Sequence, residues 1–165
     1  MQTSPTDSLR RAAGFTLLEL MVVLAIGALM VGVVLPMGAR MYDTMTYRDA
    51  VRQLSEAAHG ARYRAITTGQ SMDLVFEPDA GRFLVKPAAQ PVVGRAMEEL
   101  SGDLRFSAVT AREVSPGQGL AAIRFYPGGG STGGSLSVQR ANGSGVRLRV
   151  DWLLGRVSQE ALDLP

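Results

Sequence analysis

The feature that most constrains this chain is an apolar run near its N-terminus. Residues 20–37 contain no charged side chain, and the last acidic residue before them is Glu19. A helix rises ~1.5 Å per residue, so this run would extend to roughly the thickness of a bilayer core. The sequence therefore predicts a membrane-spanning helix over residues 15–37.

Two other structures can contain an apolar run of this kind. A cleaved secretory signal has an apolar core of only ~7–15 residues, followed by a small-residue cleavage site. A buried core helix is usually shorter and is interrupted by polar positions. The run in this chain is longer and begins next to an acidic residue, which favours the membrane span.

Glu19 needs a physical explanation, because a carboxylate inside a bilayer costs ~2.5–3.5 kcal/mol on insertion scales. One explanation is that Glu19 lies at the level of the lipid headgroups, where its charge costs little. The other is that cleavage after Gly14 makes Phe15 a new N-terminus, and that this amine on a neighbouring subunit neutralises the acid. The residues alone leave both explanations open.

The segment around Glu19 reads Gly14-Phe15-Thr16-Leu17-Leu18-Glu19-Leu20-Met21-Val22-Val23-Leu24-Ala25-Ile26. It resembles the processing and assembly motif of type IV prepilins and type II secretion pseudopilins. The resemblance implies that residues 1–14 are a leader peptide, which prepilin peptidase removes between Gly14 and Phe15 before it methylates the new amine. It also implies that Glu19 is the assembly residue.

The same resemblance implies a location. The chain would be a single-pass protein of the bacterial inner membrane, with its N-terminus in the cytoplasm before processing. Residues 38–165 would form a globular domain in the periplasm. Counting nearby arginines does not settle the orientation, since they flank the apolar run on both sides.

Beyond the run, the spacing of apolar residues predicts a helix and then strands. Apolar residues recur three or four positions apart from residue 41 to residue 66, which predicts an amphipathic helix that ends near residue 68, before Gly69. From residue 71 the alternation has a period of two, which predicts a hairpin. We expect the hairpin strands at residues 72–76 and 83–85 and further strands at residues 104–109, 121–126, 135–139, 146–152 and 155–158.

The segments between these strands include two long ones. Residues 88–99 are expected to form a loop with room for a short helix, and residues 110–119 a mobile hairpin loop. The expected fold class is therefore α+β. It consists of a long N-terminal helix packed on one or two antiparallel β-sheets, as in pilins.

Three segments beyond the apolar run carry a second resemblance. They are residues 61–66, with Arg64 where an acidic residue is more usual; residues 123–138, a strand, a glycine turn and a strand; and residues 150–157, a closing hairpin. They resemble the protein H family of type II secretion minor pseudopilins and related minor type IV pilins. The resemblance implies a subunit of the periplasmic pseudopilus. Its partners would be prepilin peptidase, other major and minor pseudopilins, and the inner-membrane platform of the secretion system.

A minor type IV pilin, active in pilus assembly or in DNA binding during natural transformation, stays open as the alternative. The arginines that could form a DNA-binding face are Arg124, Arg140, Arg147, Arg149 and Arg156. The whole chain has 17 basic and 15 acidic residues, a net charge of +2. This balance gives no general preference for nucleic acid.

No pattern predicts catalysis, a cofactor or a metal site. The chain has no cysteine, which excludes thiolate chemistry and disulfides. The glycines of residues 128–134 fit a dinucleotide-binding spacing, but a strand is expected next instead of the required helix. His59 is the only histidine, and the acidic residues at positions 73, 77 and 79 lack the spacing of a calcium loop. We therefore predict a structural subunit and not an enzyme.

Overall fold

The computed structural model describes the backbone of residues 15–162 and the side chains of residues 15–31 and 42–162. The chain divides into two compact units, Met1–Met41 and Tyr42–Pro165. The single α-helix of the described chain, α1, runs from Leu17 to Thr68 and so contributes to both units. Gly69, which follows it, has a φ of 68°, the left-handed conformation in which helices commonly end.

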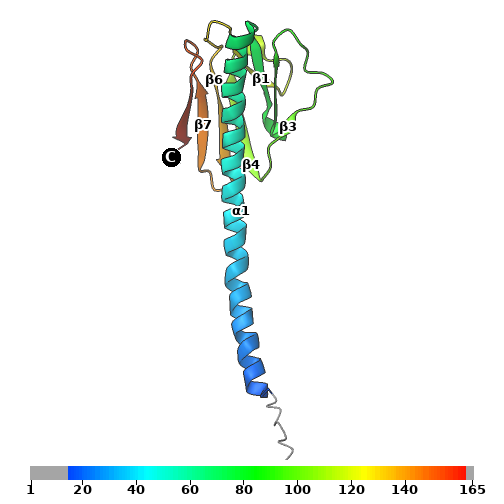
Figure 1. Ribbon diagram of the computed structural model, residues 1–165, viewed down its shortest axis with the longest axis vertical. Helices are drawn as coiled ribbons and strands as arrows, with labels where there is room; N and C mark the ends of the chain where they lie inside the picture. Colours follow the sequence, from blue (N-terminus) through cyan, green and yellow to red (C-terminus); the bar gives the residue numbers. More distant parts are fainter. Residues whose placement is uncertain (1–14, 163–165) are drawn as a thin grey trace, which may run out of the picture. The chain divides into compact units, whose positions relative to one another are not determined.

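The second unit, called the globular unit below, combines the end of α1 with two antiparallel sheets of four strands each (Figure 1). The first sheet has the order β3-β2-β1-β5 and the second the order β4-β6-β7-β8. The strands are β1 Met72–Glu77, β2 Arg82–Pro87, β3 Glu98–Glu99, β4 Leu104–Thr110, β5 Ala121–Phe125, β6 Gly134–Arg140, β7 Gly145–Val150 and β8 Val157–Leu162. Two short 3-10 helices, η1 Pro78–Ala80 and η2 Arg112–Val114, lie in the connections.

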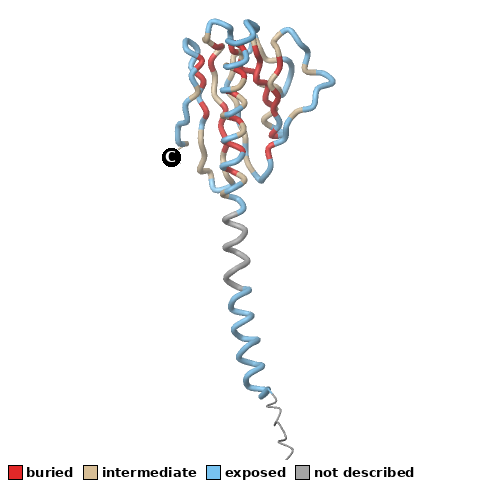
Figure 2. The backbone as a smooth tube through the Cα atoms, in the orientation of Figure 1, coloured by how far each residue is buried: buried red, intermediate tan, exposed pale blue. Residues whose placement is uncertain are grey.

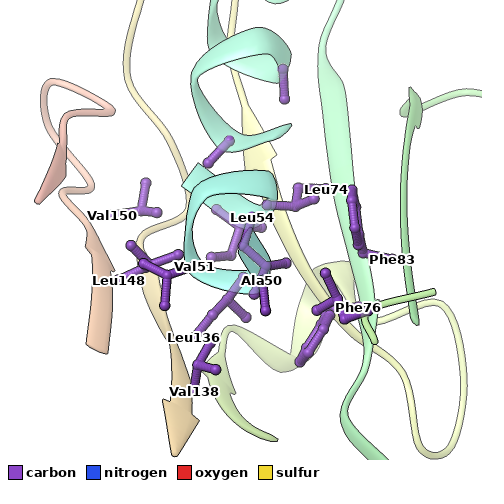
Figure 3. Packing of buried hydrophobic residues seen from close by; sticks show 14 of the residues in the cluster. Ala50, Val51, Leu54, Leu74, Phe76, Phe83, Leu136, Val138, Leu148 and Val150 are labelled. Carbon is purple, nitrogen blue, oxygen red and sulfur yellow. The ribbon is translucent and has the colours of Figure 1, made fainter. Parts of the chain in front are cut away.

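One stripe of α1 packs on both sheets and forms the main core (Figures 2 and 3). Its residues recur three or four positions apart, and each is at most 2% exposed; they are Ala50, Leu54, Ala58, Ala61 and Ala65. The first sheet contributes Leu74, Phe76, Ile123 and Phe125 to this core, and the second contributes Leu136, Val138, Leu148 and Val150. The amphipathic pattern predicted for this helix is therefore the pattern that positions it on the sheets.

The first sheet is buried on both faces. Val75, Leu84 and Ala122 lie in a second, smaller cluster, against which Val92, Met97, Val114 and Leu120 from the long connections pack. This explains why five consecutive residues of β1 are buried, although a sheet with one wet face would show alternation.

The predicted fold class is confirmed, and several local expectations need correction. Residues 110–119 do not form a hairpin loop, because they connect β4 and β5, which lie in different sheets. The strand expected at residues 146–152 is β7, Gly145–Val150, and Trp152 lies in the turn after it.

Residues 88–97, all of them described, form turns and no helix, and β3 then pairs with β2. The last strand is β8, Val157–Leu162, and not residues 155–158. The strand begins later because Gly155, with a φ of 59°, still belongs to the turn after β7.

Candidate processing and assembly site

The predicted cleavage site lies at the edge of the described chain. Gly14 is outside the described residues, so cleavage between Gly14 and Phe15 stays a prediction. Phe15 precedes α1, and its side chain is 83% exposed. Thr16 follows it directly, and α1 begins at Leu17.

Thr16 caps the N-terminus of α1. The backbone N–H of Glu19 donates to Oγ1 of Thr16 at 3.2 Å, and the N–H of Leu20 donates to the Thr16 carbonyl at 3.2 Å. A threonine followed three residues later by a glutamate is the sequence pattern of a capping box. Sequence analysis missed the role of Thr16, although this pattern was there to be recognised.

The position of Glu19 gives it a local role in addition to the predicted role in assembly. It lies in the first turn of α1, where the helix dipole favours a negative charge. Its side chain is exposed, and within the described part of the chain it forms no ion pair. Pairing of Glu19 with the amine of a neighbouring copy stays a prediction.

The helix surface that follows is apolar and exposed. No side chain of residues 15–31 is buried (Figure 2). Its large apolar residues are 49–83% exposed; they are Phe15, Leu17, Leu18, Leu20, Met21, Val22, Val23, Leu24, Ile26, Leu29, Met30 and Val31. A helix that is apolar all round is normally buried in a larger assembly or in a membrane.

The predicted membrane span extends beyond the described side chains, since it includes residues 32–37. Within the described residues, no helix is both long enough and apolar enough to cross a membrane.

The globular unit contains one buried group of charges, on neighbouring strands of the first sheet. Asp73 is the cross-strand neighbour of both Lys86 and Arg124. Lys86 Nζ lies 3.3 Å from Asp73 Oδ2, and Arg124 Nε lies 2.7 Å from Asp73 Oδ1. The side chains of Asp73 and Lys86 are each 4% exposed. The hydrogen bonds to Asp73 raise the pKa of the Arg124 guanidinium above its ordinary value.

The five arginines considered for DNA binding do not share one face. Arg124 pairs with Asp73, and the Arg140 guanidinium stacks 4.0 Å above the ring of Tyr47. Only Arg147 and Arg149 project together from β7, and Arg149 pairs with Glu160 at 3.7 Å. Arg156 lies in the turn before β8.

The other residues considered for chemistry have local structural contacts. His59 Nδ1 lies 2.7 Å from the carbonyl of Ser55, one turn earlier in α1. Gly128, Gly129, Gly130 and Gly133 lie in the turn between β5 and β6, as predicted, and Gly134 is the first residue of β6. Among the described side chains, no three histidine, aspartate or glutamate residues gather as metal ligands.

Two segments of the chain match known families. Residues 9–35 match the prokaryotic N-terminal methylation motif, and residues 50–154 match the family described as type II transport protein GspH. The chain belongs to the GspH family. The first match contains the predicted processing and assembly residues, and the second covers most of the globular unit.

Individual relatives agree with this assignment. Type II secretion system protein H of Xanthomonas campestris pv. campestris is 28% identical over 158 residues, which cover 94% of this chain and 88% of that protein. The minor pseudopilin EpsH of the Vibrio cholerae type II secretion system matches with a TM-score of 0.54 at 13% identity, over 70% of this chain and 96% of that one. The type IV minor pilin FimU of Pseudomonas aeruginosa matches with a TM-score of 0.54 at 12% identity, over 74% and 97%.

The predicted family, the protein H type of minor pseudopilins within the type IV pilin-like superfamily, is thereby confirmed. GspH proteins are structural pseudopilin subunits, and membership implies contact with other pseudopilins of the secretion system. The methylation motif and the family together fit a membrane-anchored pseudopilin with a periplasmic domain.

Proposed function

We propose that this GspH-family chain is a minor pseudopilin that prepilin peptidase cuts between Gly14 and Phe15 and that then assembles into the pseudopilus of a type II secretion system. The observation that carries the proposal is that one chain contains two parts of different kinds. A globular unit of the GspH family is joined to a helix whose apolar residues 15–31 are exposed throughout. Such a surface needs a membrane or neighbouring helices to cover it.

The proposed division of the chain follows from this function. Residues 1–14 are the leader, residues 15–37 the membrane and assembly helix, and residues 38–165 the periplasmic domain. The protein spans the bacterial inner membrane once, with the leader in the cytoplasm. The inner-membrane platform of the secretion system and other pseudopilins are its partners.

Glu19 is proposed to pair with the N-terminal amine of a neighbouring subunit. The threonine cap engages the backbone N–H of Glu19 and not its carboxylate, so the carboxylate is free to face outward. In apolar surroundings an isolated carboxylate is strongly disfavoured, whereas a paired one is tolerated. Methylation of the Phe15 amine keeps its positive charge, as it does for lysine, so the modified terminus can still serve as the partner.

The proposal is tested first at the N-terminus. Mass spectrometry of the chain from cells with and without prepilin peptidase should show a mature chain that begins at methylated Phe15 only when the peptidase is present. A functional chain that retains residues 1–14, or that starts after the apolar helix, would contradict the proposal.

A pair of variants then tests the proposed role of Glu19 in assembly. Both variants keep the backbone N–H that Thr16 caps. Glu19→Gln removes the charge and keeps a polar side chain of similar size, whereas Glu19→Leu also removes the polar group. We expect both variants to insert into the membrane and to be incorporated into pseudopili at least about tenfold less than the wild type, because the neighbouring amine loses its partner. Normal incorporation of Glu19→Gln would contradict the proposed pairing of Glu19 with a neighbouring amine. Glu56→Gln, at an exposed position of the same helix, is the matched control.

A minor type IV pilin remains the second candidate, because FimU shares the fold as closely as EpsH does. Deletion of the gene separates the two candidates. Loss of protein secretion with pilus functions intact supports the pseudopilin, and the reverse supports the pilin. Salt-dependent DNA binding by the full-length chain would support the DNA-uptake variant.

A further inference from the structure

The buried charges of the first sheet join segments that are far apart in the chain. Among the described residues, Asp73 and Lys86 are the charged residues that are buried. They lie on β1 and β2, the two strands of one hairpin, whereas Arg124 lies on β5, 51 residues beyond Asp73. Apolar residues of similar size often replace buried ion pairs without loss of stability, so this group calls for a role other than stability.

Within the hairpin, the turn already fixes how the two strands pair. β1 and β2 are joined by η1 and Gly81, whose φ of 60° is the left-handed conformation that such a tight connection uses. In a hairpin the register follows from the type and length of the turn. The contact of Lys86 with Asp73, at 3.3 Å, therefore adds to a register that the turn has set.

The pairing of β1 with β5 is not fixed in this way. The chain passes through β2, β3 and β4 before it reaches β5, and residues 111–120 form a long connection into that strand. In a sheet with one wet face, a one-residue shift would expose the apolar side chains, so the apolar pattern defines the register. The first sheet is buried on both faces, and this constraint is correspondingly weak.

A shift of two residues would keep apolar side chains on the core face of both strands. The side chains of Leu74 and Phe76 point into the main core, and in the observed register Leu74 lies opposite Ile123 (Figure 3). After such a shift of β5 in one direction, Leu74 would lie opposite Phe125. Phe76 would then lie opposite Ile123. The apolar pattern alone therefore leaves the register of β5 open.

The ion pair between Asp73 and Arg124 is satisfied in one register only. Nε of Arg124 donates to Oδ1 of Asp73 at 2.7 Å, and Nη2 donates to Oδ2 at 3.0 Å. Two parallel hydrogen bonds of this kind require one position and one orientation of the guanidinium. A two-residue shift, roughly 7 Å along the strand, would separate the pair. In one direction it would place Arg124 opposite Val75, in the smaller apolar cluster, where a guanidinium without its acid is unfavourable.

We propose that the Asp73–Arg124 pair fixes the register in which β5 joins β1. The turn between β5 and β6 moves with β5, since the N–H of Thr132 donates to the Arg124 carbonyl at 2.9 Å. The same turn is bound to the segment after β7, where the N–H of Ser131 donates to the Trp152 carbonyl at 2.9 Å. The pair therefore also positions the first sheet against the second. This role goes beyond the proposed function, because it does not depend on the assembly that the chain joins.

Engineered disulfides can report this register, because the chain has no cysteine of its own. Val75→Cys with Ala122→Cys, the native reporter, places two thiols opposite each other in the observed register. Two slipped reporters do so only after a two-residue shift in one direction or the other; they are Glu77→Cys with Ala122→Cys and Val75→Cys with Leu120→Cys. Each full-length chain is refolded in detergent with a glutathione buffer, and mass spectrometry measures the intramolecular disulfide. Without further substitutions, the native reporter should oxidise about tenfold more than the slipped reporters, whose cysteines are too far apart to bridge.

Two substitutions each remove one cation from Asp73, and only one of them removes the contact with β5. Arg124→Met should raise the disulfide yield of the slipped reporters about tenfold, because Asp73 keeps Lys86 as its partner and no longer selects one position of β5. Lys86→Met is the matched control. It keeps both hydrogen bonds between Asp73 and Arg124, so the yields should stay unchanged. Unchanged slipped yields in Arg124→Met, or an equal rise in Lys86→Met, would overturn the proposal.

A further variant keeps the positive charge on β5. Arg124→Lys cannot bind both carboxylate oxygens in the same way, because an ammonium group lacks the planar fork of a guanidinium. It should raise the slipped yields as Arg124→Met does, and it takes the place of that variant if Arg124→Met shows no cooperative thermal unfolding. Unchanged yields in Arg124→Lys would overturn the proposal, which depends on the two parallel hydrogen bonds. Processing at Phe15 does not enter this test, so its failure would leave the proposed function intact.

Discussion

The two ends of helix α1 differ in whether their apolar side chains are buried. In residues 15–31 every side chain is exposed, although nearly all of them are apolar. In the globular unit the same helix buries one stripe, including Leu54 and Ala61 at 0% exposure, against two sheets. The contrast shows that the chain provides its own core for one end of the helix and needs a membrane or other subunits for the other end.

Charged groups show the same contrast. The globular unit pairs its buried acid, Asp73, with two cations from neighbouring strands. Glu19, at the other end of the helix, has only the contact with the cap of its own helix within the described residues. We therefore expect mutations in the globular unit to change its stability. Mutations in the N-terminal part of the helix are expected to change assembly instead.

The largest effect is expected at the buried charges. Asp73→Asn should lower the free energy of unfolding of the globular unit by about 3–5 kcal/mol, because it leaves the buried Lys86 without its acid. Adding Lys86→Met should recover part of this loss, since it removes the unpaired charge. Chemical denaturation of the full-length protein in detergent measures both. Glu77→Gln, which breaks the partly exposed pair with Arg82, should cost no more than about 1 kcal/mol. Equal losses for Asp73→Asn and Glu77→Gln would show that burial does not set the cost.

The next effect is expected from matched leucines in the two parts of α1. Leu54→Ala should lower the free energy of unfolding by about 3 kcal/mol, because it leaves a cavity in the core. Leu24→Ala, at a position that is 64% exposed, should change it by less than about 0.5 kcal/mol. Incorporation into pseudopili should fall for Leu24→Ala, since the proposed assembly packs the side chain of Leu24 between subunits. If Leu24→Ala lowered the free energy of unfolding as much as Leu54→Ala does, the contrast between the two ends of α1 would be wrong.

Much of this contrast could be predicted from the sequence, because it depends on local periodicity. The all-apolar run, the amphipathic stripe and the Gly69 stop are properties of neighbouring residues, and they predicted a helix that ends where α1 ends. The alternation after residue 71 likewise predicted the hairpin of β1 and β2.

Other features depend on contacts between distant segments and could not be predicted in this way. The short strand β3 exists because β2 offers it an edge, and the second buried face of the first sheet exists because the long connections fold over it. The same holds for the arginines. Pairing of β1 with β5 brings Arg124 to Asp73, and packing of the helix on the second sheet brings Arg140 to Tyr47. The cap by Thr16 is different, since its signal is local and was simply not recognised.

A smaller effect is expected at the start of α1. Thr16→Ala should cost the first turn of the helix about 1 kcal/mol, because the N–H of Glu19 loses its acceptor. Hydrogen exchange of the amides in the first turn should become about fivefold faster, with the globular unit unaffected. Thr16→Ser keeps the acceptor and should behave as the wild type. Slower assembly of Thr16→Ala with unchanged exchange would mean that Thr16 acts through something other than the cap.

The smallest effect is expected at Tyr47, which is buried just before the stripe that begins at Ala50. Burial raises the pKa of the Tyr47 phenol above its ordinary value of 10.0, and the nearby Arg140 guanidinium opposes this in part. Because the folded state holds this proton more tightly than the unfolded state, the resulting stability is fully present below pH 10 and is lost as the pH rises through the folded-state pKa. Tyr47→Phe keeps the ring beneath Arg140 but cannot titrate, so its stability should fall less steeply above pH 10 than that of the wild type. Tyr42→Phe, at a side chain that is 69% exposed, should follow the wild-type curve. Identical alkaline profiles for wild type and Tyr47→Phe would mean that the globular unit does not shield Tyr47 from water, and that the protected part of the helix begins later than this residue.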